Sequence, residues 1–150
     1  MNKQVLFIRH SWTGWLNGGE ESASDFLYKN SKVAIDFMAG GDNIDNYKTI
    51  DGKPYKAAIR ALNLLKDASD KGDEVIVVAT YLHLNNNIVI GTAKKNSFCV
   101  EKILCKDRDI ELKTLMLENT FQVEKSTFPL LFSLQPPYAT LCIWEKGRLA

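Results

Sequence analysis

Two tryptophans stand close together near the amino end of the chain, where an apolar segment gives way to polar residues. Five residues with chemically useful side chains follow the run VLFI: Arg9, His10, Ser11, Trp12 and Trp15. Flat rings at the end of a strand can stack on a planar ligand such as a nucleobase, and Arg9 and His10 could contact its phosphates. The alternative is that one or both indoles fill the core, because tryptophan is largely buried wherever it occurs.

A second group of candidates ends the segment KVAIDF. Phe37 continues the alternation of Val33 and Ile35, which predicts a place in the core or at the mouth of a pocket. Asp36 is a carboxylate within an apolar strand, and it could accept a hydrogen bond from the amino group of a base. A carboxylate that faces solvent, or that pairs with a nearby cation, is the competing interpretation.

Further aromatic and basic side chains come later in the chain. Tyr81 ends an apolar strand and could stack on a base, and His83 could reach a phosphate, although surface packing at a hairpin end is the simpler role for both. Lysines before the long helix and after the next strand could contact phosphates or merely form a solvated face. The lysines predicted to bind phosphate are Lys53, Lys94 and Lys95.

Catalytic and metal-binding motifs are sparse. His10 and His83 have no HxH or HExxH context, and the patterns GxSxG, GxxxxGK[ST] and GxGxxG do not occur. No catalytic residue, metal or cofactor is therefore expected. One short match, DRDIELK, could hold magnesium and activate water through Asp109, Glu111 and Lys113. Such matches arise by chance in charged segments, so a nuclease is the weaker alternative.

Hydrophobic periodicity predicts the elements that must position these side chains. Strands are expected at 5–8, 32–38, 74–82, 88–93, 113–118 and 140–144. A short helix around Phe26 and Tyr28 should follow a serine cap. A longer helix should have Pro54 at its first position and end just before Gly72.

The order of these elements favours a mixed barrel. The strands at 74–82 and 88–93 form a direct hairpin about an asparagine-rich turn, which implies antiparallel pairing. The second half of the chain lacks the helices that the crossovers of a doubly wound parallel sheet need. The expected fold is α+β: a small, mostly antiparallel barrel of five or six strands with two or three flanking helices, in one domain spanning residues 1–150.

Composition narrows the class of protein. A net charge of +1, from 19 basic and 18 acidic residues, argues against nonspecific wrapping of nucleic acid. The three cysteines lack CxxC spacing, which argues against a disulfide framework or a zinc site and suits a reducing cytoplasm. No apolar run is long enough for a signal-peptide core or a membrane span, so a cytoplasmic protein is expected.

Four segments together carry a family resemblance: VLFIRHS, GGEESASDFLYKNSKVAIDF, AIRALNLLKDASDKGDEVIVVA and NNNIVIGTAKK. Their layout resembles the PUA-like superfamily, and most closely its EVE and YTH-related branches. Within these branches, the layout resembles the domain found at the N-termini of modification-dependent restriction proteins of the McrBC type. The sequence Lys71-Gly72-Asp73, with the strand and hairpin after it, matches best. Where the family often has Gly-Trp after the second strand's apolar residues, this chain has Asp36-Phe37.

The resemblance implies a barrel whose aromatic pocket receives a flipped, often methylated, base. The expected pocket residues are Ser11, Trp12, Trp15, Asp36, Phe37 and Tyr81. We therefore expect a non-catalytic module that recognises a modified base in DNA, as the specificity domain of a restriction system. Its ATPase or nuclease would lie outside these residues or on a partner subunit. The alternatives are a PUA-like RNA-binding module in RNA processing or modification, and the magnesium-dependent nuclease described above.

Overall fold

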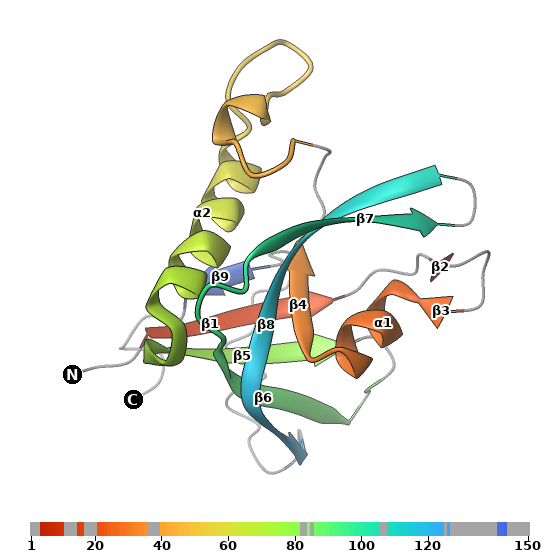
Figure 1. Ribbon diagram of the computed structural model, residues 1–150, viewed down its shortest axis with the longest axis vertical. Helices are drawn as coiled ribbons and strands as arrows, with labels where there is room; N and C mark the ends of the chain where they lie inside the picture. The colour runs from red at the N-terminus through yellow and green to blue at the C-terminus, as the bar shows by residue number, and fades with distance from the viewer. Residues whose placement is uncertain are drawn as a thin grey trace.

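A mixed β-sheet curled into a half-barrel, with two α-helices beside it, forms the body of the protein (Figure 1). The computed structural model describes residues 4–10, 15–16, 21–35, 40–81, 84, 86–105, 108–124, 126 and 141–143. The strands are β1 (Gln4–His10), β2 (Trp15–Leu16), β3 (Glu21–Ser22), β4 (Lys32–Ile35), β5 (Val75–Tyr81), β6 (Asn87–Ala93), β7 (Cys99–Cys105), β8 (Arg108–Glu124) and β9 (Leu141–Ile143). The helices are α1 (Ala23–Lys29) and α2 (Lys56–Lys71), with short 3-10 turns η2 (Ile44–Asn46) and η3 (Gly72–Glu74).

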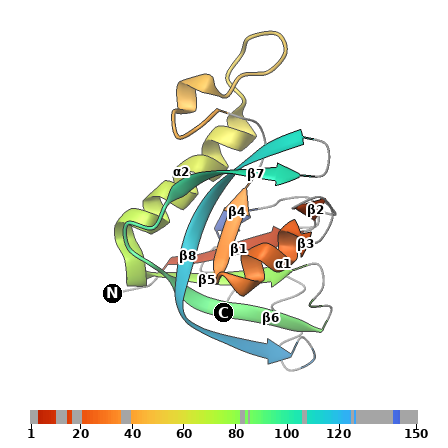
Figure 2. The same cartoon turned by 45° about the vertical axis from the view of Figure 1, so that its right-hand side comes forward.

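Strand β8 joins the two parts of the sheet. Its 17 residues pair with β7 and β4 in the first part and with β6 in the second, so it is longer than most strands in globular proteins. The sheet continues from β6 through β5 and β1 to β9, and from β7 through β2 to β3. Among the described strands only β1 and β5 pair in parallel. Figure 2 shows β8 curving from its neighbour β7 to its neighbour β6.

A β-bulge bends β8 where its neighbours change. Ile90 of β6 pairs with Phe121, whereas Thr92 pairs with Glu118, so β8 has one extra residue in this interval. Asn119 lies within the interval and takes a left-handed backbone conformation, with φ of 53°. A bulge increases the local twist and turns the side chains that follow it. The directions in which the side chains of residues 120–122 point therefore depend on this bulge.

Gly91 lies opposite the bulge and allows the two strands to approach closely. A Cβ atom at this position would lie 2.9 Å from the carbonyl oxygen of Glu118 and 2.9 Å from Cγ2 of Thr120. Gly91→Ala is therefore expected to lower the free energy of unfolding by about 1–3 kcal/mol, because a backbone atom must move. Urea denaturation measures the change, with Thr92→Ala on the same strand as the control. A Gly91→Ala protein as stable as the parent would contradict the close approach.

Helix α2 packs one face against the inner side of the sheet because its small and apolar side chains recur at helical spacing. The positions concerned are Ala58, Ala61, Leu62, Leu65 and Ala68, all of which are buried. They share one core cluster with Leu6, Ile8, Val75, Val77 and Ala79 of β1 and β5. The helix stops at Gly72, whose φ of 65° suits glycine. No helix in the described ranges is both long and apolar enough to cross a membrane.

The structure confirms the predicted α+β class, the two helices, the hairpin of β5 and β6, and the strands β1, β4, β8 and β9. The short strands β2 and β3 were not predicted, nor was β7, because polar side chains interrupt the apolar pattern of β7. One of them, Glu101, is satisfied by an ion pair in which Lys32 Nζ lies 2.9 Å from its carboxylate. A charged residue in a strand centre thus had a partner 69 positions away in sequence.

Two local predictions need correction. Pro54 is not the first residue of the long helix, because it forms an isolated bridge with Lys48 and the helix begins at Lys56. Strand β4 was predicted to alternate, but Val33, Ala34 and Ile35 are all buried. Strand β4 pairs with β8 along one edge, and α1 and β1 also pack against it, so that these three side chains are covered.

Candidate functional site

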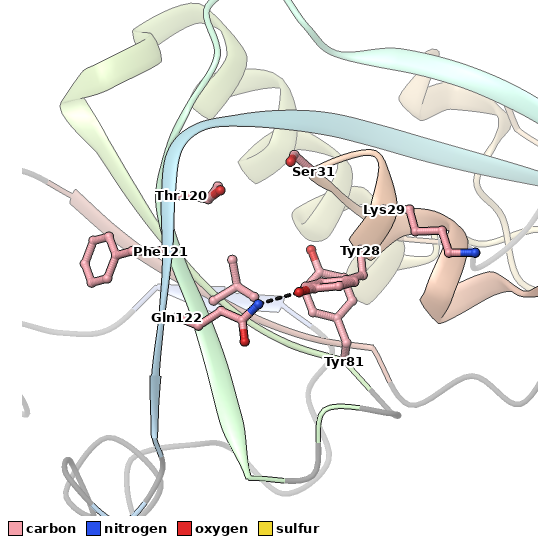
Figure 3. A pocket seen from close by; sticks show the side chains of 8 residues that line it. Tyr28, Lys29, Ser31, Tyr81, Thr120, Phe121 and Gln122 are labelled. Atoms are coloured by element: carbon pink, nitrogen blue, oxygen red, sulfur yellow. Dashed lines mark hydrogen bonds between the residues drawn. The ribbon is translucent and has the colours of Figure 1, made fainter.

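A surface hollow of about 480 Å³ opens between α1, the end of β5 and the bulged part of β8 (Figure 3). Its volume falls within the range of about 300–1,000 Å³ that is usual for small-molecule pockets. The residues that line it are Tyr28, Lys29, Ser31, Tyr81, Val89, Thr120, Phe121 and Gln122. We call this the Tyr28 hollow. Tyr81, a predicted base-binding residue whose side chain the structure describes, is among them.

Two tyrosine rings form the aromatic part of the Tyr28 hollow. The ring of Tyr28, on α1, meets the ring of Tyr81 edge-on, with 5.6 Å between centroids and 67° between planes. Tyr81 is only 3% exposed, and its hydroxyl donates to the carbonyl oxygen of Lys32 at 2.6 Å. Burial, with a smaller contribution from Tyr28, raises the pKa of Tyr81 above its usual range. Tyr81 therefore stays neutral and fixed, whereas Tyr28 is only partly buried and can offer a ring face.

The polar side of the Tyr28 hollow comes from β8. The Nε2 amide of Gln122 donates to the hydroxyl of Tyr28, and its Oε1 accepts from Asn87 Nδ2 at 3.1 Å. Figure 3 shows Gln122 pointing toward Tyr28, while the ring of Phe121 points away from it. Residues alternate across a strand, so the bulge decides which of these two side chains faces the tyrosines. An exposed amide held by two partners is oriented to read the edge of a planar ligand.

His10 packs against the ring of Tyr81 within the core and does not face solvent. Its ring is stacked on Tyr81 with 4.7 Å between centroids and is 1% exposed. Nδ1 lies 3.0 Å from the carbonyl oxygen of Thr80, and Nε2 accepts from the backbone amide of Ala34 at 3.0 Å. Burial lowers the pKa of His10 to about 4, although the bond to Thr80 opposes this shift. The predicted phosphate contact is therefore corrected: His10 is a neutral core residue here.

The other predicted pocket residues fall mostly outside the described part of the chain. Ser11, Trp12, Asp36 and Phe37 lie outside it. Trp15 is described only as backbone, where it pairs with Ser22 in β2 and β3. The pocket predicted around these residues thus stays a prediction.

The predicted phosphate-binding cations do not gather in one place. Arg9 is half-buried on the face of β1 opposite to His10, since side chains alternate along a strand. Lys53 lies before the start of α2, whereas Lys94 and Lys95 lie beside its end, where Lys95 approaches Gly72. Helix α2 has 16 residues, which separates its two ends by about 24 Å. The cation that does border the hollow is the exposed Lys29, which sequence reasoning missed.

A second cluster lies beneath the segment that precedes α2. Lys113 is fully buried, with Nζ 3.5 Å from Glu111 Oε1 and 5.4 Å from the centroid of the Tyr47 ring. The same Glu111 oxygen accepts from the backbone amide of Gly41 at 2.7 Å, and the Tyr47 hydroxyl donates to the carbonyl oxygen of Gly41 at 2.6 Å. Burial, then the carboxylates of Glu111 and Asp42, raise the pKa of Tyr47 to about 12.

In the segment DRDIELK, which suggested a nuclease, two of the three candidate residues lie together in the structure. Glu111 and Lys113 share one face of β8, while the side chain of Asp109 lies outside the described residues. In this conformation the Glu111 carboxylate is engaged by Gly41 and Lys113, and it fastens the segment around Gly41 to β8. No group of three or more His, Cys, Asp or Glu side chains in the described ranges could hold a metal ion.

Comparison with known proteins adds no relative to this description. No protein-family model, no curated protein and no solved structure matches the chain. The Tyr28 hollow and the Glu111–Lys113 cluster are therefore interpreted from their own geometry and chemistry.

Proposed function

We propose that this chain is a non-catalytic, PUA-like recognition module that binds a methylated base flipped out of cytoplasmic DNA. In this proposal it is the specificity domain of a restriction system, and the cleavage machinery belongs to other residues or a partner subunit. The observation that supports it is the Tyr28 hollow, which combines a partly exposed aromatic ring with an oriented amide and a lysine at its edge. These are the groups that grip a planar, hydrogen-bonding ligand attached to a phosphate.

Each wall of the hollow has a distinct role in this proposal. The Tyr28 ring stacks on the base, an interaction worth about 1–3 kcal/mol. The Gln122 amide keeps one N–H and one lone pair beyond its bonds to Tyr28 and Asn87, and these pair with a base edge that offers one acceptor and one donor. The methyl group of the modified base lies against the apolar Val89 and the buried ring of Tyr81. Selectivity for one methyl group in an apolar site amounts to about 1–3 kcal/mol.

Substitution of Tyr28 tests the proposal directly. Tyr28→Ala is expected to weaken binding to a methylated duplex about tenfold, because one stacking surface is lost. Tyr28→Phe keeps the ring and should bind nearly as the parent does. Fluorescence anisotropy measures the dissociation constants for duplexes with one 5-methylcytosine or N6-methyladenine, for the unmodified duplex and for RNA of matched sequence. The proposal fails if the parent does not prefer a methylated duplex, and stronger binding to RNA would favour the RNA-processing alternative.

The same titrations test whether the two tryptophans contact the base. Trp12→Ala and Trp15→Ala should each weaken binding several-fold if the indoles form a wall of the base site. If both variants bind like the parent while Tyr28→Ala does not, the base site is the Tyr28 hollow without the indoles. Circular dichroism of each variant confirms that the fold is intact.

A further inference from the structure

A short hydrogen-bonded finger, residues 47–55, projects beyond the start of α2 (Figures 1 and 2). Lys48 and Pro54 form an antiparallel bridge across its base. Nearer the tip, the amide of Thr49 donates to the carbonyl oxygen of Lys53 at 2.8 Å, and the amide of Gly52 donates back to Thr49 at 2.9 Å. Backbone hydrogen bonds therefore hold the 47–55 finger in one shape along its whole length.

The root of the finger is fastened to the protein core. Tyr47 is 1% exposed, its backbone oxygen accepts from the amide of Tyr55 at 2.9 Å, and its hydroxyl donates to Gly41. Gly41 is in turn held by Glu111 of β8. The buried Glu111–Lys113 cluster thus braces the finger, so that its tip is presented in a fixed position.

The tip combines an apolar side chain with surrounding positive charge. Ile50 is fully exposed, at 110% of its reference area, and Gly52 beside it forms the turn with φ of 81°. Lys48, Lys53 and Lys56 are all exposed, whereas Asp51 is the single acidic residue between positions 47 and 56. A lone exposed apolar side chain is common. An isoleucine at the apex of a braced turn, among lysines, is a more specific arrangement.

We propose that the 47–55 finger is a wedge that inserts Ile50 between two base pairs of duplex DNA, while the neighbouring lysines contact the flanking phosphates. This inference rests on the proposed function, and it adds a second contact with the same ligand. Architectural DNA-binding proteins use isoleucine and similar side chains in this way, and the unstacking they cause bends the duplex. A preformed finger loses little conformational entropy on binding.

The arrangement of the molecule defines what this wedge does. The finger projects at the end of the molecule away from α1 and the ends of β6 and β8, where the Tyr28 hollow lies (Figure 1). Ile50 therefore does not fill the gap left by a base that enters the hollow. It acts at a separate step of the same duplex, and the resulting bend brings more DNA phosphates toward the lysines.

Ile50→Ala tests the wedge, since the side chain touches solvent and the substitution leaves the core unchanged. The probe is a methylated duplex with 2-aminopurine at successive positions and a donor–acceptor dye pair at its ends. Parent protein should raise 2-aminopurine fluorescence at one step and shorten the end-to-end distance. Ile50→Ala should abolish both signals and weaken binding about tenfold. Ile50→Leu should restore them, and Ile44→Ala, just outside the finger and 38% exposed, should leave them unchanged.

The outcomes separate the two proposals. If the parent prefers the methylated duplex and Ile50→Ala gives the same affinity and the same bend, the wedge is wrong and the proposed function stands. If the parent does not bind duplex DNA, the proposed function fails and the wedge fails with it. A flotation assay with phosphatidylserine vesicles tests whether the finger binds a membrane instead. Parent binding to vesicles that Ile50→Ala abolishes would make the finger a membrane-inserting tip and overturn the DNA wedge.

Discussion

Glu111→Ala is expected to destabilise the protein by about 3 kcal/mol or more, because it removes the carboxylate beside a fully buried lysine ammonium. Lys113 would lose this counter-charge in a site with little access to water. The partly buried backbone amide of Gly41 would also lose the acceptor that it meets at 2.7 Å, and loss of such a hydrogen bond costs about 0.5–1.5 kcal/mol. The two penalties act together, so this single substitution should have a larger effect than those at the surface.

A matched set of variants isolates the cause. Lys113→Met removes the buried charge and keeps an apolar stem of similar length, so it should cost less than Glu111→Ala. In the double variant the alanine should be less harmful than it is alone, because no ammonium is left without its carboxylate. Asp67→Ala breaks the exposed pair with Lys71, at 2.9 Å, and should cost below about 1 kcal/mol. Urea denaturation at pH 7 measures all four, and additive costs at 111 and 113 would contradict the coupling.

The elements that the sequence predicts well are those whose pattern is local. Helix α2 follows from apolar positions between Ala58 and Ala68, all within one helix face. The hairpin of β5 and β6 follows from two apolar runs separated by a short polar turn. In both cases neighbouring residues in the sequence determine the outcome, and no distant partner is needed.

The elements and site residues that were missed depend on distant partners. Glu101 interrupts the pattern of β7, and its ion pair with Lys32 becomes visible only when β4 and β7 lie beside β8. Gln122 faces Tyr28 because an extra residue in β8 shifts the register with β6, and no composition signal marks that bulge. A polar residue in a strand is ambiguous until its partner is known.

The segment DRDIELK shows the same limit in a functional prediction. An acid and a lysine two residues apart lie on one face of a strand, which is why the pair was linked to metal-dependent cleavage. That shared face is turned inward here, toward Tyr47 and the segment around Gly41. The spacing was interpreted correctly, but the sequence does not say whether the face meets solvent or core.

His10 gives the second large expected effect, a loss of stability in mild acid. Its Nε2 accepts a hydrogen bond from the Ala34 amide, so a proton on that nitrogen would place two donors against each other. Burial lowers the pKa of His10 to about 4 in the folded protein, and the bond to Thr80 opposes this shift. The unfolded chain keeps a histidine pKa near 6.5. Between these values the unfolded state binds more protons than the folded state, so acid favours unfolding.

The stabilisation by neutral His10 is therefore complete above about pH 6.5 and is lost progressively as the pH falls toward 4. From pH 7 to pH 5 we expect the free energy of unfolding to decrease by about 2 kcal/mol from this residue alone. Urea denaturation at the two pH values measures it. His83→Gln, which removes the chain's other histidine, should keep the decrease, whereas His10→Gln should be less stable at pH 7 and lose it. An unchanged pH dependence in His10→Gln would mean that burial does not keep this ring neutral in the folded protein.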